Sequence, residues 1–256
     1  MKTWTSKILL TIFYLALSFL LTTFIDAPLF DHPSKIVDIV TSNEINYHPQ
    51  TSTILIIGSS VAAGWGDNHQ GGYLIRALTQ YATKFHQSYH ILNWSIPGLT
   101  TKELAPHFKV MLQKSHPDIV ILSWGGLDDA AAGTTTSHFL TRVKSEVNQA
   151  LQAKAYVLLI TPPVTQATYK NSFKGLPRRY FQAQMHAFST PDTINVSAID
   201  LFSQMLSYIN KHHIPESTLA ADGWHPNVKG HTLAGNLLFT DLSQRFHHGP
   251  IKFHSP

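Results

Sequence analysis

From residue 53 onward, short apolar runs alternate with stretches whose apolar residues fall at helical spacing, and this alternation constrains the fold most. The apolar runs are 53–57, 90–94, 118–124, 156–161 and 193–197, and each is expected to be a strand. The helical spacing covers 73–85, 139–151 and 233–242. Continuous apolar strands separated by helices are typical of a sheet buried on both faces. The sequence therefore predicts a three-layer α/β/α sandwich around a central, mostly parallel five-stranded sheet.

Composition bounds the class of protein. The 256 residues are 43% apolar, enough for one domain with a real core. The net charge of +4 is spread along the chain, with no basic run longer than Arg178-Arg179, so no nucleic-acid partner is predicted. The absence of cysteine excludes disulfides, thiol catalysis and Cys-based zinc sites. The 16 histidines are dispersed without a metal-binding spacing, so neither a metal nor a cofactor is predicted.

The N-terminus has the pattern of an export signal. Lys2 and Lys7 precede an uncharged apolar run, 8–25, whose length as a helix is about 27 Å, close to the hydrocarbon thickness of a bilayer. A cleaved signal peptide and an uncleaved signal anchor are both compatible with this pattern. The poor cleavage site, with Ala27 between Asp26 and Pro28, favours the anchor. Either way, the rest of the chain is expected outside the cytoplasm, membrane-anchored by its N-terminus or secreted or periplasmic.

This gives a division into four parts. Residues 1–26 form the signal anchor or signal peptide, and 27–52, with three prolines and no sustained periodicity, form a linker. Residues 53–247 form the α/β domain, and 248–256 form a tail.

Four short motifs follow predicted strands or precede the last helix. They are Gly58-Ser59-Ser60, the glycine Gly98, Gly125-Gly126-Leu127-Asp128, and Asp222-Gly223-Trp224-His225. Functional groups of parallel sheets gather at the carboxyl ends of the strands. An Asp three residues before a His on a loop can accept the Nδ1 proton and leave Nε2 free as a base. Each motif alone is also an ordinary turn or helix cap.

Together and in this order, the four motifs resemble the SGNH/GDSL hydrolase family. That family has a Gly-Asp-Ser turn after its first strand, a lone glycine after the second, Gly-x-Asn-Asp after the third, and Asp-x-x-His before the last helix. The resemblance covers about 53–242, and the layout is similar to small periplasmic thioesterase/lysophospholipase-type members. It implies an SGNH/flavodoxin-like sandwich. The Gly-x-Ser-x-Gly elbow of ordinary α/β-hydrolases is not matched, because Ala62 occupies its last position.

The resemblance also implies a serine ester hydrolase. Ser60 would attack the ester carbonyl, His225 would take and return the proton, and Asp222 would orient His225. The backbone N–H groups of Ser60 and Gly98 would receive the oxyanion.

The sequence departs from the family pattern at two places. Ser59 replaces the aspartate before the nucleophile, and mild consequences are expected. Counting along the third strand puts Leu127 at the position of the family asparagine, which donates to the oxyanion, whereas a one-residue shift puts Asp128 there. Asp128 would serve only if burial keeps it protonated. Water, Asn93 or Ser95 are alternative donors.

The predicted function is extracytoplasmic hydrolysis of a carboxylic ester: a small acyl ester, a lysolipid or an acylated glycan. O-acyl transfer or deacetylation on cell-envelope glycans, and a non-catalytic binding role, are the alternatives. The segment 162–175 follows the fourth strand and is expected to be a substrate loop. Trp65, Trp124 and Trp224 stand within or beside the motifs, where they either line a cleft or pack around the strand ends.

Overall fold

The centre of the structure is one six-stranded sheet with the strand order β1-β3-β2-β4-β5-β6. The computed structural model describes residues 35–39, 51–67, 70–189, 194–246 and 249–254. The strands are β1 (Lys35–Ile39), β2 (Ser52–Gly58), β3 (Tyr89–Asn93), β4 (Ile119–Ser123), β5 (Tyr156–Ile160) and β6 (Val196–Ile199). Strands β2 to β6 are parallel, which confirms the predicted sandwich with its five parallel strands.

The sixth strand, β1, corrects the prediction that 27–52 is only a linker. Residues 35–39 of that segment pair antiparallel with β3, from Lys35 opposite Asn93 to Ile39 opposite Tyr89. The outer edge of β3 offers backbone N–H and C=O groups that need partners, and a run rich in β-branched residues suits an edge strand. The prolines that indicated a linker, at 28, 33 and 49, lie outside these five residues.

The predicted apolar runs form the inner strands because helices cover both faces of the sheet. Every residue of β4 and of β5 is buried, and Ile54 to Ile57 of β2 have no exposed surface. The last strand is displaced from the predicted 193–197 toward Ile199. That residue is buried, whereas the side chain of Ile194 is 69% exposed.

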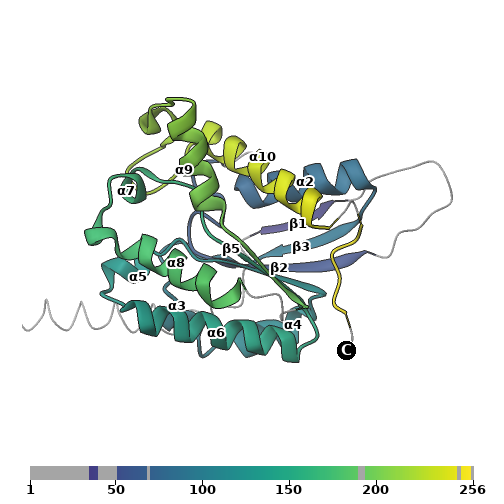
Figure 1. Cartoon of the computed structure of the whole chain (residues 1–256). Helices are drawn as coiled ribbons and strands as arrows, with labels where there is room; N and C mark the ends of the chain where they lie inside the picture. Colours follow the sequence, from purple (N-terminus) through teal and green to yellow (C-terminus); the bar gives the residue numbers. More distant parts are fainter. Residues whose placement is uncertain (1–34, 40–50, 68–69, 190–193, 247–248, 255–256) are drawn as a thin grey trace, which may run out of the picture. The chain divides into compact units, whose positions relative to one another are not determined.

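Figure 1 shows α2, α9 and α10 on one side of the sheet and α4, α6 and α8 on the other. The helices are α2 (Gly72–Phe85), α3 (Thr101–Leu104), α4 (Phe108–Ser115), α5 (Leu127–Ala131), α6 (Thr136–Gln152), α7 (Gln166–Tyr169), α8 (Leu176–Phe188), α9 (Leu201–Lys211) and α10 (Val228–Arg245), with 3-10 turns η1 (Phe173–Gly175) and η2 (Glu216–Leu219). Within the described ranges, no helix has the length and apolar character needed to cross a bilayer. The predicted signal segment, 1–26, lies outside those ranges.

Helices α2 and α10 pack closely against each other. A Cβ atom at Gly235 of α10 would lie 2.9 Å from the Arg76 Cβ atom and 3.2 Å from the Tyr73 carbonyl oxygen, both on α2. Glycine permits this approach because it has no side chain. Since Ser60 precedes α2 and His225 precedes α10, the packing draws together two loops that are 165 residues apart in sequence.

The predicted tail, 248–256, packs on the domain where it is described. Ile251 is buried, and the Tyr81 hydroxyl donates to the Gly249 carbonyl oxygen at 2.5 Å. The Asn195 amide exchanges hydrogen bonds with the backbone of His254 at 2.9 and 2.7 Å. Residues 249–254 are therefore part of the folded domain.

Candidate active site

Ser60 lies in the tight turn that follows β2. Gly58, the last residue of β2, has no room for a side chain, because a Cβ atom there would lie 2.3 Å from the Ser123 carbonyl oxygen on β4. The turn is held by the Trp65 N–H, which donates to the Ser60 carbonyl oxygen at 3.0 Å. The turn places Ser60 at the carboxyl edge of the sheet, with 9% of its surface exposed.

His225 lies on the loop between η2 and α10, and that loop is fixed at both ends. The Ala221 N–H donates to the His225 carbonyl oxygen at 2.9 Å. Asn227 caps α10 by accepting from the Gly230 N–H at 3.1 Å, and its amide donates to the carbonyl oxygen of Ala220 at 3.1 Å. Side-chain caps of this kind stabilise a helix start and fix the chain that enters it.

The structure brings Ser60, Asp222 and His225 into one hydrogen-bonded row. The distance from His225 Nε2 to Ser60 Oγ is 2.9 Å, and His225 Nδ1 lies 2.8 and 2.9 Å from the two carboxylate oxygens of Asp222. A carboxylate can only accept, so Nδ1 carries the proton and Nε2 is free to accept from the Ser60 hydroxyl.

Asp222 is held in its charged form. Its partial burial acts to raise its pKa, but hydrogen bonds from the His225 ring and from the backbone N–H groups of Trp224 and His225 outweigh it, so the pKa lies below its usual range. The backbone bonds, 2.7 and 2.9 Å long, also fix the rotamer of the carboxylate. The carboxylate is therefore ionised and held in place beside the His225 ring.

The loop after β4 directs Asp128 toward the site and turns Leu127 away from it. Leu127 is buried. Asp128 forms a side-chain hydrogen bond with Ser59 and is close enough to His225 for an electrostatic interaction between the two side chains. The next residue, Asp129, is buried and accepts two hydrogen bonds from the first residue of α3. Of the two positions considered in the sequence, Asp128 is the one whose side chain lies near the serine and histidine.

The pKa of Asp128 is raised above its usual value. Burial raises its pKa, the hydrogen bond with Ser59 opposes this, and the negative charge of Asp129 raises it further. A protonated carboxyl has an O–H donor, as the amide of asparagine has an N–H donor. In its protonated form, Asp128 would therefore supply a donor at this edge of the sheet.

Gly98 lies on the loop after β3 with φ = 82° and is exposed. The loop is tied to the end of β2, because the Ile96 N–H donates to the Gly58 carbonyl oxygen at 3.1 Å. No atom of the described residues lies within 4 Å of a Cβ built at Gly98, so among these residues its backbone borders open space.

Asn93, one of the alternative donors considered from the sequence, is engaged elsewhere. Its amide donates to the Ala62 carbonyl oxygen at 3.0 Å and accepts from the Ser95 N–H at 3.2 Å, with no exposed surface. Asn93 supports the turn after Ser60 and is not placed to meet an oxyanion. The Ser95 hydroxyl is buried and has no hydrogen-bond partner among the described residues.

Two of the three tryptophans near the motifs are exposed at the site. The Trp65 side chain is 52% exposed, and its ring centroid lies 5.6 Å from that of His225. Trp224 is 36% exposed, and its ring packs edge-on against Phe173 with the ring centroids 5.8 Å apart. Trp124 is buried and donates to Glu146 at 2.9 Å, so this ring packs behind the strands.

The segment 162–175, the expected substrate loop, contacts the histidine loop directly. The Ala167 N–H donates to the Gly223 carbonyl oxygen at 2.8 Å. Asn171, Phe173 and Lys174 all have φ between 53° and 60°, a conformation that costs non-glycine residues about 1–3 kcal/mol each and clusters at functional sites. The strained turn sets the Phe173 ring against Trp224.

Sequence reasoning missed two buried polar residues near the site, Glu146 and His231. Both lie on the apolar face of their helices, Glu146 beside Val143 and Val147 on α6, and His231 beside Ala234 on α10. A polar residue at an apolar helical position is the signal that identifies such residues.

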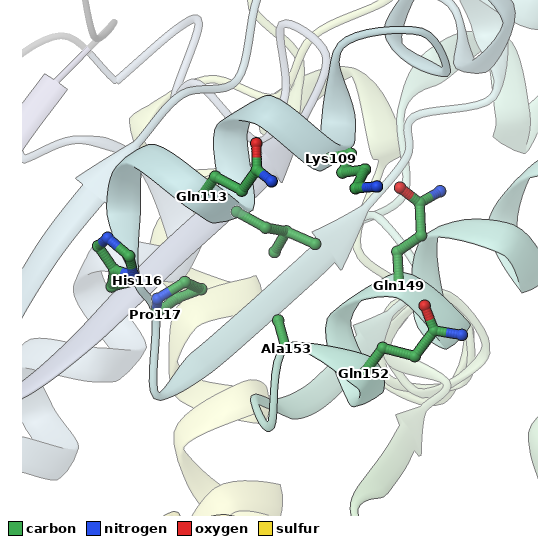
Figure 2. Close-up of a pocket in the computed structure, with 8 residues that line it drawn as sticks. Lys109, Gln113, His116, Pro117, Gln149, Gln152 and Ala153 are labelled. Atoms are coloured by element: carbon green, nitrogen blue, oxygen red, sulfur yellow. The ribbon is translucent and has the colours of Figure 1, made fainter.

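A surface cavity of about 530 Å³ lies between α4 and α6, and Ser60, Asp222 and His225 are not among its lining residues (Figure 2). Its lining residues are Lys109, Leu112, Gln113, His116, Pro117, Gln149, Gln152 and Ala153. Pro117 shortly precedes β4 and Ala153 shortly precedes β5, so the cavity opens at the amino ends of these strands. Within the described ranges, no group of three His, Asp or Glu side chains is placed to hold a metal ion.

Known proteins share this architecture. A structure of a catalytic mutant of Axe2, an acetylxylan esterase from Geobacillus stearothermophilus, has 16% sequence identity and a TM-score of 0.62, covering 75% of this chain and 94% of that one. The structure of TesA has 21% identity and a TM-score of 0.57, covering 75% and 98%. The lipase/acylhydrolase from Enterococcus faecalis has 22% identity and a TM-score of 0.57, covering 76% and 96%.

No curated protein sequence is similar enough to this chain to count as a match. The profile of the GDSL-like Lipase/Acylhydrolase family matches residues 56–233, a range that begins in β2, contains Ser60, Asp222 and His225, and ends in α10. The chain therefore belongs to the GDSL-like lipase/acylhydrolase family and is a hydrolase that acts on ester bonds.

Proposed function

We propose that this chain cleaves carboxylic esters outside the cytoplasm through an acyl-enzyme formed on Ser60. The observation that carries the proposal is the row of contacts from Ser60 Oγ through His225 to Asp222, with all three distances between 2.8 and 2.9 Å. Distances in this range let a histidine take a proton from a serine as the serine attacks.

In the proposed reaction, Ser60 Oγ bonds to the ester carbonyl carbon while its proton passes to His225 Nε2. The tetrahedral intermediate collapses as His225 returns this proton to the leaving alcohol. Water then repeats the sequence on the acyl-enzyme: His225 takes a proton from water, hydroxide adds to the acyl carbon, and Ser60 leaves with the proton. Asp222 stabilises the imidazolium at both stages.

The proposed oxyanion site consists of the N–H groups of Ser60 and Gly98, with Asp128 as a third donor in its protonated form. The raised pKa of Asp128 and its place beside Ser59 support this role. Loss of one such donor costs about 2.7–4 kcal/mol of transition-state stabilisation.

The test is turnover of p-nitrophenyl esters, from acetate to decanoate, by the full chain and its Ser60→Ala and Asp222→Asn variants. Ser60→Ala is expected to lower kcat by roughly 10⁴-fold or more, and Asp222→Asn by roughly 10²–10⁴-fold. The matched control is Ser59→Ala, which removes the neighbouring hydroxyl and is expected to keep kcat within about tenfold, since no proton transfer passes through it. Turnover that survives Ser60→Ala would refute the mechanism, and a folded wild type without turnover would favour the non-catalytic role.

A second candidate, hydrolysis or transfer of acyl groups on glycans, is supported by the aromatic rings beside His225. Trp65, Phe173 and Trp224 are each at least about a third exposed, and exposed aromatic patches mark binding surfaces. Axe2, whose fold this chain shares, is an acetylxylan esterase. Incubation with acetylated oligosaccharides distinguishes hydrolysis from transfer. A hydrolase releases acetate with water as the only acceptor, whereas acyl loss by a transferase depends on an added glycan acceptor.

The proposed location rests on the basic start and the apolar run 8–25. A reporter enzyme that is active only outside the cytoplasm, fused after residue 256, is expected to be active. The same fusion with Lys2 to Ile25 deleted is expected to be inactive. Activity of the deleted fusion would place the export signal elsewhere.

A further inference from the structure

His231 is a wholly buried histidine that the proposed reaction does not use. It lies six residues after His225, in the first turns of α10. Its Nδ1 accepts from the Tyr73 N–H at 3.1 Å, and its Nε2 lies 2.8 Å from the Trp65 carbonyl oxygen. An amide N–H can only donate and a carbonyl can only accept, so the ring is neutral with its proton on Nε2.

His231 is hydrogen-bonded to the loop 64–67, here called the Trp65 loop, and this loop is closely packed against neighbouring backbone. Its flanking residues, Gly64 and Gly66, have φ of 88° and 89°. A Cβ atom at Gly64 would lie 2.6 Å from the Gly71 carbonyl carbon, and one at Gly66 would lie 2.0 Å from the Pro226 carbonyl oxygen. The loop is thus in contact with the start of α2 on one side and with the residue after His225 on the other.

This loop contacts both members of the proton-transfer pair. The Trp65 N–H donates to the Ser60 carbonyl oxygen, and the Trp65 ring lies 5.6 Å from the His225 ring. Because the Trp65 side chain is half exposed, packing of the ring alone does not fix this residue. The backbone hydrogen bonds of Trp65, to Ser60 and to His231, hold it in place.

We infer that His231 is a positioning residue, which in its neutral form holds the Trp65 loop against Ser60 and His225. The inference rests on the proposed function for its effect on catalysis. The contacts of His231 itself stand without it.

Several charged or titratable groups face the His231 ring. Asp67, in the same loop as Trp65, is paired with Arg76 of α2 through contacts of 2.6 and 3.1 Å. Burial lowers the pKa of His231, the Trp65 carbonyl and Asp67 oppose this, and Arg76 and His225 lower it further. Tyr73 of α2 stacks on the ring, and burial keeps its phenol protonated. A second proton, on Nδ1, would set two donors against each other at the Tyr73 N–H.

The contribution of His231 to the stability of the fold is expected to fall as the pH falls. The folded pKa of His231 lies below its unfolded value of about 6.5, so the neutral ring stabilises the fold fully above that pH. As the pH falls below about 6.5, the unfolded chain takes up the proton first and this stability is lost.

The experiment compares His231→Gln and His231→Leu with the wild-type full chain. Glutamine offers a donor nitrogen and an acceptor oxygen but does not take up a proton in this pH range, whereas leucine offers neither. His138→Gln, at an exposed position of α6, is the matched control. The measurements are kcat and KM for p-nitrophenyl acetate, Tm from pH 8 to pH 5, and ¹⁵N spectra of the imidazole rings.

His231→Leu is expected to lower kcat by roughly tenfold or more with little change in KM, because a displaced catalytic pair loses rate rather than binding. His231→Gln is expected to recover most of kcat and to lose less Tm than wild type below pH 6.5. The ¹⁵N spectra are expected to show a neutral His231 with the proton on Nε2.

Wild-type kcat in His231→Leu, equal impairment of both variants, or an identical fall in Tm for wild type and His231→Gln would each overturn the inference. If His231→Leu does not fold, the inference is decided by comparing the fall in Tm from pH 8 to pH 5 between His231→Gln and wild type. The spectra and Tm need no turnover. A wild type as inactive as Ser60→Ala therefore counts against the proposed function, while these two measurements still decide on His231.

Discussion

At the scale of single residues, Glu146 is the least expected group near the site. It is fully buried on α6, with one carboxyl oxygen accepting from the Trp124 indole at 2.9 Å and the other without a partner among the described residues. Burial raises the pKa of Glu146 to about 8, against the Trp124 hydrogen bond, and the charge of Asp129 adds to the rise. The carboxyl is therefore neutral at pH 7 behind the loop that carries Asp128.

Glu146→Gln is expected to stabilise the protein at alkaline pH. The folded carboxyl keeps its proton up to about pH 8, whereas the unfolded one loses it near pH 4.3, so wild-type stability falls as the pH rises between these values. The amide has no proton to lose. Urea unfolding is expected to show a gain of roughly 2–5 kcal/mol at pH 8 and little at pH 4.5, since each pH unit between the two pKa values corresponds to about 1.4 kcal/mol.

Glu216→Gln, a change at a partly exposed glutamate, serves as the control and is expected to show no such pH dependence. An equal effect of Glu146→Gln at both pH values would show that the buried carboxyl is ionised in the folded protein.

The sequence identifies Ser60, Asp222 and His225 as candidates because their motifs are local, and the structure brings them together. The choice between Leu127 and Asp128 needs the turn that follows β4, where the left-handed Gly126, with φ = 72°, decides which side chain faces Ser59. Glu146 and His231 escape an interpretation based on motifs because burial depends on partners far away in sequence.

At the scale of elements, the junction of β2 with the Ser60 turn depends on Gly58. Because a Cβ atom on this residue would lie only 2.3 Å from the Ser123 carbonyl oxygen, any side chain there would push β2 away from β4. The displacement would occur two residues before the proposed nucleophile.

Gly58→Ala is expected to lower stability by about 1–3 kcal/mol, the usual cost of overpacking. It is also expected to lower kcat on p-nitrophenyl acetate by roughly 10²-fold, as for a catalytic group misplaced by about 1 Å. Gly133→Ala is the control. It has open space but a left-handed φ of 71°, so it is expected to lose about 1 kcal/mol with an unchanged kcat. Wild-type kcat in a folded Gly58→Ala variant would show that the turn adjusts without moving Ser60.

The five parallel strands are predictable because burial on both faces leaves long apolar runs in the sequence. The edge strand β1 is not, because its five residues are flanked by prolines and its pairing depends on the free edge of β3. The shift of the last strand toward Ile199 has a similar cause, since an exposed Ile194 looks the same in sequence as a buried one.

At the scale of the whole molecule, the two ends of the domain meet. Helix α2, near the beginning, and helix α10, near the end, pack through Gly235, and the segment 249–254 is bonded to α2 through Tyr81. The order of the motifs in the sequence predicts that they share one edge of the sheet, and the structure adds the close packing that sets their spacing. The cavity between α4 and α6 lies at the other edge of the sheet (Figure 2).

The separation of 165 residues between Ser60 and His225 also has a consequence in time. A growing chain acquires its proposed nucleophile, Ser60, early and its proposed base, His225, only when synthesis is nearly complete. Until α10 has been made and has docked on α2, Ser60 is an ordinary hydroxyl without a proton acceptor. Under the proposed mechanism, a nascent or still unfolded chain therefore cannot attack esters, and activity begins only when the fold is complete.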